Sequence, residues 1–195
     1  MSGWSESAGA WIASLGEAGD WGRAFVLDKA VTERVAGRGF RRMLDVGCGE
    51  GRLCRMFRPL GLETVGVDPT RALLDRARAL DPGGLYIEGA AEKLEFPGEA
   101  FDLVVSYLSL IDIPDYRAAI SEMARVLKPG GRLVVVEFAP HTQEHLRAEH
   151  AHRHLGVSEQ DMARWADKAG LAVRSAKTFA APGGDKGISV MVWSA

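Results

Sequence analysis

The sequence predicts an α/β protein in which a mostly parallel sheet is covered by helices on both faces. Short apolar runs alternate with segments of helical periodicity along most of the chain, which is the pattern of strand–helix–strand units. Two runs, at residues 103–105 and 133–136, are continuously apolar, as expected of central strands buried on both faces. The 195 residues, of which 47% are apolar, suffice for a single domain with one core.

Seven strands are expected. They lie at residues 42–46, 63–67, 85–88, 101–106, 131–138, 171–178 and 187–193. Between the last two strands the segment 181–186 contains Pro and two Gly but no helical pattern, which predicts a hairpin.

Three helices follow from apolar spacing and from their start and stop residues. The first is capped by Thr70, the second follows Pro114 and ends at residues 128–131, and the third runs from 158 to 168 and stops at Gly170. Their expected inward residues are Leu73, Leu74, Ala77 and Leu80 in the first, Tyr116, Ile120, Met123 and Leu127 in the second, and Met162, Trp165 and Ala166 in the third.

Three glycines on alternate positions, Gly47, Gly49 and Gly51, directly follow the first predicted strand. Gly47 suits the turn from strand to helix, Gly49 lets the backbone approach a ligand, and Gly51 lets the next helix pack closely. The second strand leads into Asp68, about 20 residues after the first glycine, where a carboxylate can accept hydrogen bonds from ribose hydroxyls. These features predict a nucleotide-cofactor pocket; the alternative is an ordinary strand–helix turn with Asp68 as a helix cap.

The glycine spacing separates two classes of cofactor. A dinucleotide fingerprint reads G-x-G-x-x-G and directs a helix N-terminus at a pyrophosphate, whereas this chain reads G-x-G-x-G with the acidic Glu50 inside the loop. A carboxylate there would repel a diphosphate but is tolerable beside a sulfonium and an amino acid group. The loop therefore favours a sulfonium cofactor over a dinucleotide.

Taken together, the segments LDVGCGEGRL, VGVDPT, IEGAAEKLEF, FDLVVSYLSLID and RVLKPGGRLVVVE resemble class I S-adenosylmethionine-dependent methyltransferases, most closely the ubiquinone/menaquinone C-methylase-like group. The resemblance implies a Rossmann-like seven-stranded sheet of order 3-2-1-4-5-7-6 with its last strand antiparallel. It also implies transfer of a methyl group from S-adenosylmethionine to an oxygen, nitrogen or activated carbon of a small molecule. Residues 1–40 would form a helical cover, 41–138 the cofactor-binding core, and 139–195 a histidine-rich segment, a helix and the hairpin.

The resemblance implies which residues hold the methionine part and the ribose. Residues from Asp45 to Gly51, Cys48 among them, would wrap the methionine part through backbone amides and carbonyls, and Asp68 would bind the ribose. Arg23, in the N-terminal cover, is a candidate for a bidentate contact with the cofactor carboxylate.

The adenine site departs from the family pattern at one position. Pro69 or Thr70 is expected to pack on the adenine, but Ala90 stands where the family commonly has an aspartate that binds the adenine amino group. A backbone contact from Ala91 remains. Glu92 either compensates for the missing acid or only begins a helix.

Three residues are candidates for the methyl-transfer step: Tyr107, Asp112 and His141. Ser106 and Tyr107 end the fourth strand, where open α/β sheets bind ligands, and the resemblance places the floor of the methyl-transfer site there. Ser106 is expected to contact the cofactor. Tyr107 hydrogen-bonds substrate or cofactor, or is simply a packed aromatic. Asp112 is either a base or a helix cap, and His141 has an imidazole suited to a general base near neutral pH.

All five histidines fall between residues 141 and 154. His141/His145 and His150/His154 have the four-residue spacing of some metal sites. However, no H-E-x-x-H pattern occurs and arginines lie nearby, so we expect no metal site and interpret the segment as a charged, solvated lid.

The N-terminal 40 residues suggest two amphipathic helices rich in tryptophan, the second running from Trp21 to Val35. In similar enzymes such segments cover the active site. The alternative is that they only close one edge of the core.

Composition narrows the class of partner. A net charge of −2 and a pI near 6.2 disfavour nucleic acid, and no apolar run approaches the ~20 residues of a membrane span. Cys48 and Cys54 form no disulfide framework and are interpreted as buried fillers. We therefore expect a cytoplasmic protein that acts on a small molecule, with the oligomeric state open. The alternatives are an RNA or protein methyltransferase, a Rossmann-like dehydrogenase or binding protein, and a catalytically silent cofactor-binding subunit.

Overall fold

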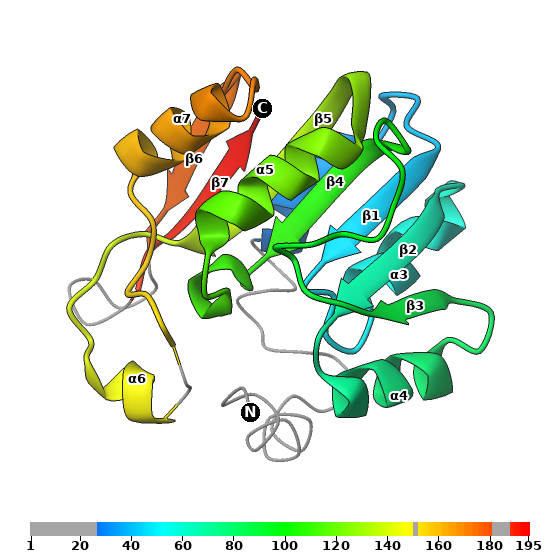
Figure 1. The fold of residues 1–195 in the computed structure, drawn as a ribbon, viewed down its shortest axis with the longest axis horizontal. Coiled ribbons are helices and arrows are strands. Elements are labelled where there is room, and N and C mark those ends of the chain that lie inside the picture. The colour runs from blue at the N-terminus through cyan, green and yellow to red at the C-terminus, as the bar shows by residue number, and fades with distance from the viewer. Residues whose placement is uncertain (1–26, 150–151, 181–187) are drawn as a thin grey trace.

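The computed structural model describes residues 27–149, 152–180 and 188–195, which form an α/β fold around one sheet (Figure 1). The strands are β1 (Arg42–Val46), β2 (Glu63–Asp68), β3 (Leu85–Glu88), β4 (Phe101–Tyr107), β5 (Leu127–Phe138), β6 (Ser175–Phe179) and β7 (Val190–Ser194). They lie in the order β3-β2-β1-β4-β5-β7-β6, and β7 runs antiparallel to both of its neighbours. The predicted strand order and the antiparallel final strand are confirmed.

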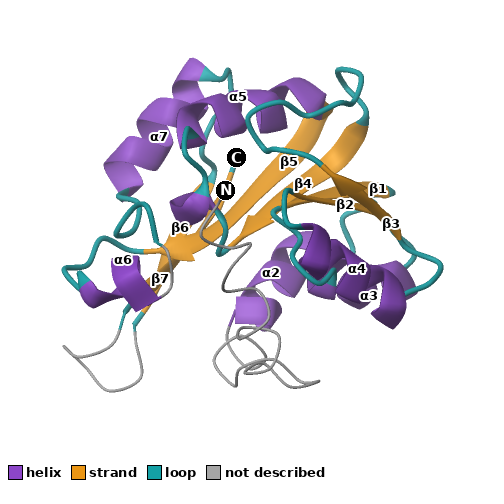
Figure 2. Ribbon diagram, turned by 60° about the horizontal axis from the view of Figure 1, so that its bottom comes forward, coloured by secondary structure: helices purple, strands orange, loops and turns teal. Residues whose placement is uncertain are grey.

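Helices cover both faces of the sheet, as Figure 2 shows. They are α2 (Asp28–Val35), α3 (Arg52–Phe57), α4 (Arg71–Leu80), α5 (Tyr116–Val126), α6 (His145–Glu149) and α7 (Glu159–Lys168), with short 3₁₀ turns η2 (Arg58–Leu60) and η3 (Leu110–Asp112). One core lies under α5 and α7 and contains Val104 and Val135; the other lies under α2, α3 and α4 and contains Leu103 and Val134. Neighbouring residues of β4 and β5 thus enter opposite cores, which confirms that these strands are central.

Three strands start more than one residue from the predicted position, and β2, β4, β6 and β7 each end one residue later than predicted. β5 begins at Leu127, directly after α5, and a register shift between Phe101 and Leu103 accommodates residues 128–131 as an irregularity within the strand. β6 begins only at Ser175, because the backbone up to Leu171 is used to end α7: the Leu171 amide donates to the Ala166 carbonyl at 2.8 Å. β7 runs from Val190 to Ser194; the expected start of this strand at Gly187 and the connection before it lie outside the described residues.

The expected helices are present, with two local corrections. Leu80 is 37% exposed because it is the last residue of α4, beyond the turns that pack through Leu73, Leu74 and Ala77. Thr70 occupies the N-cap position of α4, but its side chain makes no capping hydrogen bond. Ser158 does cap α7, since its hydroxyl accepts from the Asp161 amide at 3.0 Å.

The described part of the N-terminal cover is α2, which contacts β7 on the sheet face that also carries α3 and α4. The tryptophans predicted to form the rest of the cover lie outside the described residues. Cys48 and Cys54 are buried and free, as expected. Within the described ranges, no helix combines the length and the apolarity needed to span a bilayer.

Candidate active site

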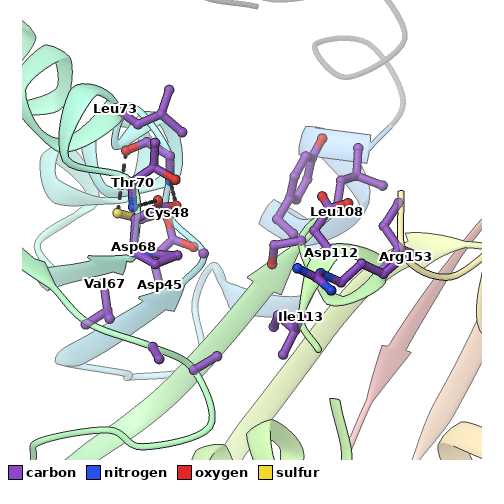
Figure 3. Close-up of a pocket in the computed structure, with 18 of the residues that line it drawn as sticks. Asp45, Cys48, Val67, Asp68, Thr70, Leu73, Leu108, Asp112, Ile113 and Arg153 are labelled. Atoms are coloured by element: carbon purple, nitrogen blue, oxygen red, sulfur yellow. Dashed lines mark hydrogen bonds between the residues drawn. The ribbon is translucent and has the colours of Figure 1, made fainter. Parts of the chain in front are cut away.

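A cavity of about 640 Å³ lies at the carboxyl ends of the parallel strands, where open α/β sheets bind ligands. Its volume falls within the range of small-molecule sites, about 300–1,000 Å³. Figure 3 shows two walls that face each other, with Asp45, Asp68 and Thr70 on one and Asp112 and Arg153 on the other. The glycine-loop wall comprises residues 45–53, 67–73 and 89–92 that line the cavity; the opposite wall comprises lining residues from 107–114, with Phe138, Leu146, His152, Arg153 and Ile188.

The glycine loop is held by its own backbone hydrogen bonds. The amides of Gly47 and Cys48 donate to the Val67 carbonyl at 2.8 and 3.0 Å, and the Gly49 amide donates to the Asp68 carboxylate at 2.9 Å. These three amides therefore join the ends of β1 and β2. Because they are engaged within the protein, side chains carry more of the polar recognition than the sequence suggested.

Gly49 and Gly51 have different structural roles. Gly49 has a φ of +54°, and a Cβ built on it would meet no atom within 4 Å, so this residue leaves space at the cavity. Gly51 has a φ of +76° at the start of α3, and a Cβ there would lie 2.4 Å from the Tyr86 ring. Gly51 does not line the cavity. It lets α3 begin close to β3, which is the packing role predicted for it.

Asp68 ends β2 with its carboxylate in the glycine-loop wall. One oxygen accepts from Gly49 and the other accepts from the Thr70 amide at 2.8 Å. Burial raises the pKa of this carboxyl, and the two backbone amides oppose that rise. Each oxygen keeps acceptor capacity for a further hydrogen bond.

Asp45 is the most deeply buried acid of the glycine-loop wall, at 1% exposure. Among the described residues its Oδ1 has no hydrogen-bond partner, and Oδ2 accepts only a long contact of 3.9 Å from the Cys54 thiol. Burial, with a smaller contribution from the nearby Asp68, raises the pKa of Asp45 to about 7. Asp45 lines the cavity, so a cationic donor such as an ammonium group bound there could partner this buried carboxyl.

Glu50 does not act as the isolated negative charge that the sequence suggested. Its carboxylate forms an ion pair with Arg55 at 3.2 Å, and the same guanidinium also donates to the Glu50 carbonyl. The helix turn that follows the loop thus neutralises the acid within it. Because Glu50 is paired, any electrostatic argument against a diphosphate depends on Asp45 and not on Glu50.

The expected adenine residues lie together in the glycine-loop wall: Pro69, Ala90, Ala91 and Glu92 all line the cavity. Ala91 is buried. The Glu92 carboxylate accepts from the backbone amide of Asp115 at 3.4 Å, at the start of α5. Glu92 thus contacts the start of α5 instead of beginning a helix of its own. It also lines the cavity.

Tyr107 begins the opposite wall and is more than a packed aromatic. Its hydroxyl donates to Asp28 in α2 at 3.2 Å. The Asp28 carboxylate also pairs through both oxygens with the guanidinium of Arg52, which lines the cavity at the start of α3. Asp28 therefore joins the described part of the N-terminal cover to both walls.

Ser106 lies beneath the cavity and does not line it. It is fully buried, and its hydroxyl is 2.9 Å from the hydroxyl of Ser109. Ser109 lines the cavity and donates to the Val46 carbonyl at 3.1 Å. The predicted contact of Ser106 with a cofactor is thus replaced by support of Ser109, because the side chain of Ser106 points into the sheet packing.

Asp112 lines the cavity from η3 and is not the cap of the following helix. Asp115 is that cap, accepting from the amides of Arg117 and Ala118. Glu137, fully buried at the end of β5, anchors η3 by accepting from the Ile111 amide at 3.1 Å, and burial raises its pKa to about 8. The position of Asp112 is therefore set by a carboxyl group beneath it.

Among the described histidines, His152 lines the cavity and His141 does not. After β5 the chain turns away at residues 139–140, and His141 packs against Phe138 while its Nδ1 accepts from the Gln143 amide at 3.3 Å. Burial lowers the pKa of His141. His152 instead stacks on Phe138 with ring centroids 5.8 Å apart. The predicted role of His141 as substrate-side base is not supported by this placement.

His150 and Arg23 lie outside the described residues, so the second histidine pair and the expected cofactor contact of Arg23 are not described. Among the described residues, no group of three or more His, Cys, Asp or Glu side chains could hold a metal ion.

Sequence reasoning missed Arg52, Ser109, His152 and Arg153 as cavity residues. Arg52 directly follows Gly51, the last glycine of the loop, and this position could have identified it as a cavity residue. The other three had no such signal, because they reach the cavity through contacts between segments distant in sequence.

Part of the chain is similar to known methyltransferases. A family model described as a methyltransferase domain matches residues 44–135. A demethylmenaquinone methyltransferase from Thermus thermophilus is 42% identical over 106 residues, 51% of this chain and 48% of that protein. A malonyl-[acyl-carrier protein] O-methyltransferase from Salmonella typhimurium is 36% identical over 102 residues, 52% of this chain and 41% of that protein. The chain spans about half the length of these curated relatives.

The fold of this chain also resembles that of a solved methyltransferase structure. The structure of phosphoethanolamine N-methyltransferase 2 from Haemonchus contortus in complex with S-adenosyl-L-methionine superposes with a TM-score of 0.75 at 18% identity, covering 97% of this chain and 56% of that one. The matched family model spans the strands that build the glycine-loop wall, and the sheet has the strand order that the sequence resemblance implied. About half of the chain is thus similar to methyltransferase domains, and its relatives include demethylmenaquinone and ubiquinone/menaquinone methyltransferases.

Proposed function

We propose that the chain transfers a methyl group from S-adenosylmethionine to an oxygen, nitrogen or activated carbon of a small molecule. The observation that carries this proposal is a single cavity with two buried carboxylates, Asp45 and Asp68, on one wall and a largely apolar surface on the other. When bound, S-adenosylmethionine would supply a methyl group activated by the positive charge on its sulfur. Relatives named for demethylmenaquinone and for a malonyl group support an organic acceptor.

Each part of the glycine-loop wall suits one part of this cofactor. Asp45 lines the cavity and its Oδ1 has no described partner, so a bound ammonium group would favour its ionised form over the protonated form that burial promotes. Asp68 retains acceptor capacity for the ribose hydroxyls. Pro69 and Ala91 offer an apolar surface to the adenine ring.

The opposite wall would position the acceptor. Because the donor is already activated, holding the acceptor atom in line in a water-poor site can contribute about 7–11 kcal/mol to lowering the barrier. Leu108, Ile111 and Phe138 line this wall and exclude water. Tyr107 and Asp112 are the polar side chains there that we propose orient or deprotonate the acceptor.

Binding of S-adenosylhomocysteine, measured by calorimetry, tests the cofactor assignment. The wild-type protein is expected to bind it, and Asp68→Ala is expected to abolish binding because the ribose loses its acceptor. Asp75→Ala, in which an exposed carboxylate of α4 is removed, is the matched control and should bind as the wild type does. Undiminished affinity of Asp68→Ala would contradict the ribose assignment, and a wild-type protein that does not bind would refute the cofactor itself. Methyl transfer to components of a cell extract then separates an enzyme from a silent cofactor-binding subunit.

A further inference from the structure

We infer that the opposite wall binds an anionic group of the methyl acceptor, a carboxylate or a phosphate, through the guanidinium of Arg153. The inference rests on the proposed function and adds the chemical class of the acceptor. In Figure 3 the Arg153 side chain extends from the wall that faces Asp45 and Asp68, with its guanidinium directed into the space between the walls.

The backbone that carries Arg153 is fixed to the loop after β4. The Arg153 amide donates to the Ile111 carbonyl at 3.2 Å, and the next amide, of His154, donates to the same carbonyl at 3.1 Å. The His154 ring lies 3.3 Å through Nε2 from the Ile113 carbonyl and packs edge-on against Tyr116. These contacts hold the base of the Arg153 side chain at the cavity.

Arg153 has a charge available for a ligand. Among the described residues, the arginine or lysine side chains that line the cavity are Arg52 and Arg153. Arg52 is paired with Asp28 through both carboxylate oxygens, whereas Arg153 forms no ion pair within 4.0 Å of any described carboxylate, Asp112 on the same wall included. Arg153 is also exposed, so a ligand can reach it.

The cofactor's own carboxylate is a poor candidate for this position. In an amino acid moiety the carboxylate and the ammonium group share one carbon atom, so a cofactor whose ammonium meets Asp45 keeps its carboxylate near the glycine-loop wall. Arg153 stands on the wall across from it. The anion that Arg153 binds therefore belongs to the second ligand.

The surroundings of Arg153 define the rest of that ligand. Ile111, Ile113, Phe138 and Leu146 line the same wall and offer an apolar surface. A guanidinium presents two parallel donors that match a carboxylate or a phosphate. The polar side chains Asp112 and His152 line the same wall. The structure thus assigns to the acceptor an apolar body with an anionic end.

The test uses the wild-type protein saturated with S-adenosylhomocysteine and three probes of similar shape: benzoate, phenyl phosphate and neutral benzamide. Chemical-shift titrations of the 21.1 kDa protein measure the affinity for each probe. The anionic probes are expected to bind roughly tenfold or more tightly than benzamide, because a charge-assisted hydrogen bond replaces a neutral one. Whichever of the two anions binds more tightly identifies the group as carboxylate or phosphate.

Arg153→Gln is expected to remove this preference, and Arg153→Lys, which keeps the charge but not the fork, to retain part of it. Arg117→Gln, which removes an exposed arginine of α5 that does not line the cavity, is the matched control and should retain all of it. Equal binding of the charged and neutral probes, no saturable binding of any probe, or a preference that survives in Arg153→Gln would overturn the inference. So would a loss of S-adenosylhomocysteine affinity in Arg153→Gln, since Arg153 would then serve the cofactor. Failure of the proposed function is seen separately, as a wild-type protein that does not bind S-adenosylhomocysteine.

Discussion

Replacing Asp45 with asparagine removes one buried titratable group while almost preserving the shape of its side chain. Burial raises the pKa of Asp45 from an ordinary value of 3.8 to about 7, so the folded protein holds a proton there that the unfolded chain has already released. The free energy of unfolding of the wild-type protein must therefore fall as the pH rises from about 4 to about 7. At 1.36 kcal/mol per pH unit, the fall due to this residue is about 4 kcal/mol.

Asparagine does not titrate, so the Asp45→Asn protein should lack this part of the pH dependence. Urea unfolding at pH 4.5, 6.0 and 7.5 measures the difference in free energy of unfolding between the two proteins. We expect the difference to shift in favour of the variant by about 3 kcal/mol between pH 4.5 and pH 7.5, because part of the titration lies outside this range. Asp75→Asn, at a position with a side chain 60% exposed, is the control and should follow the wild-type curve. Parallel curves for wild type and Asp45→Asn would show that burial does not hold the Asp45 carboxyl protonated, and would refute the reasoning from its raised pKa.

Two further predictions concern the supports of the opposite wall. Asp28→Ala should remove the contacts of α2 with both Arg52 and Tyr107 and lower the free energy of unfolding by roughly 2 kcal/mol. In a double-mutant cycle Tyr107→Phe should then cost about 1 kcal/mol in the wild-type background and almost nothing in Asp28→Ala, and additive effects would argue against a shared network. Glu137→Gln should flatten the decline in thermal stability between pH 5 and pH 8. Burial raises the pKa of Glu137 to about 8, so the contribution of this carboxyl to the free energy of unfolding is lost as the pH rises toward that value. An unchanged decline would mean that this carboxyl is ionised throughout.

The glycine-loop wall was largely predictable because its residues lie where consecutive strands end. Asp45 ends β1 with the loop directly after it, and Asp68 ends β2, so the parallel pairing of these strands brings the two carboxylates together. The same local logic fixed most strands to within a residue or two. The strand order was not contained in the apolar periodicity; it followed from the family resemblance, since periodicity says which residues are buried but not which strands are neighbours.

The opposite wall could not be predicted in the same way because long-range contacts assemble it. The loop containing Arg153 is placed by the Ile111 carbonyl, η3 is placed by Glu137, and the Tyr107 hydroxyl is placed by Asp28. None of these pairs has a spacing that a sequence pattern identifies. His141 was favoured over His152 because it lies nearer to the end of β5, yet the turn after the strand directs the later histidine toward the cavity.

Glu50 and Asp45 show why a charge in a motif must be judged with its surroundings. Both are acids of the same loop region, and both line the cavity. Arg55 neutralises Glu50 one helical turn later, so the acid that first distinguished a sulfonium cofactor from a dinucleotide has little net charge to offer. Asp45 gave no such signal in the sequence, but in the structure it holds a buried oxygen without a described partner. The preference for a cationic ligand therefore depends on a residue of β1, and the pH dependence of the Asp45→Asn protein measures the property that confers it.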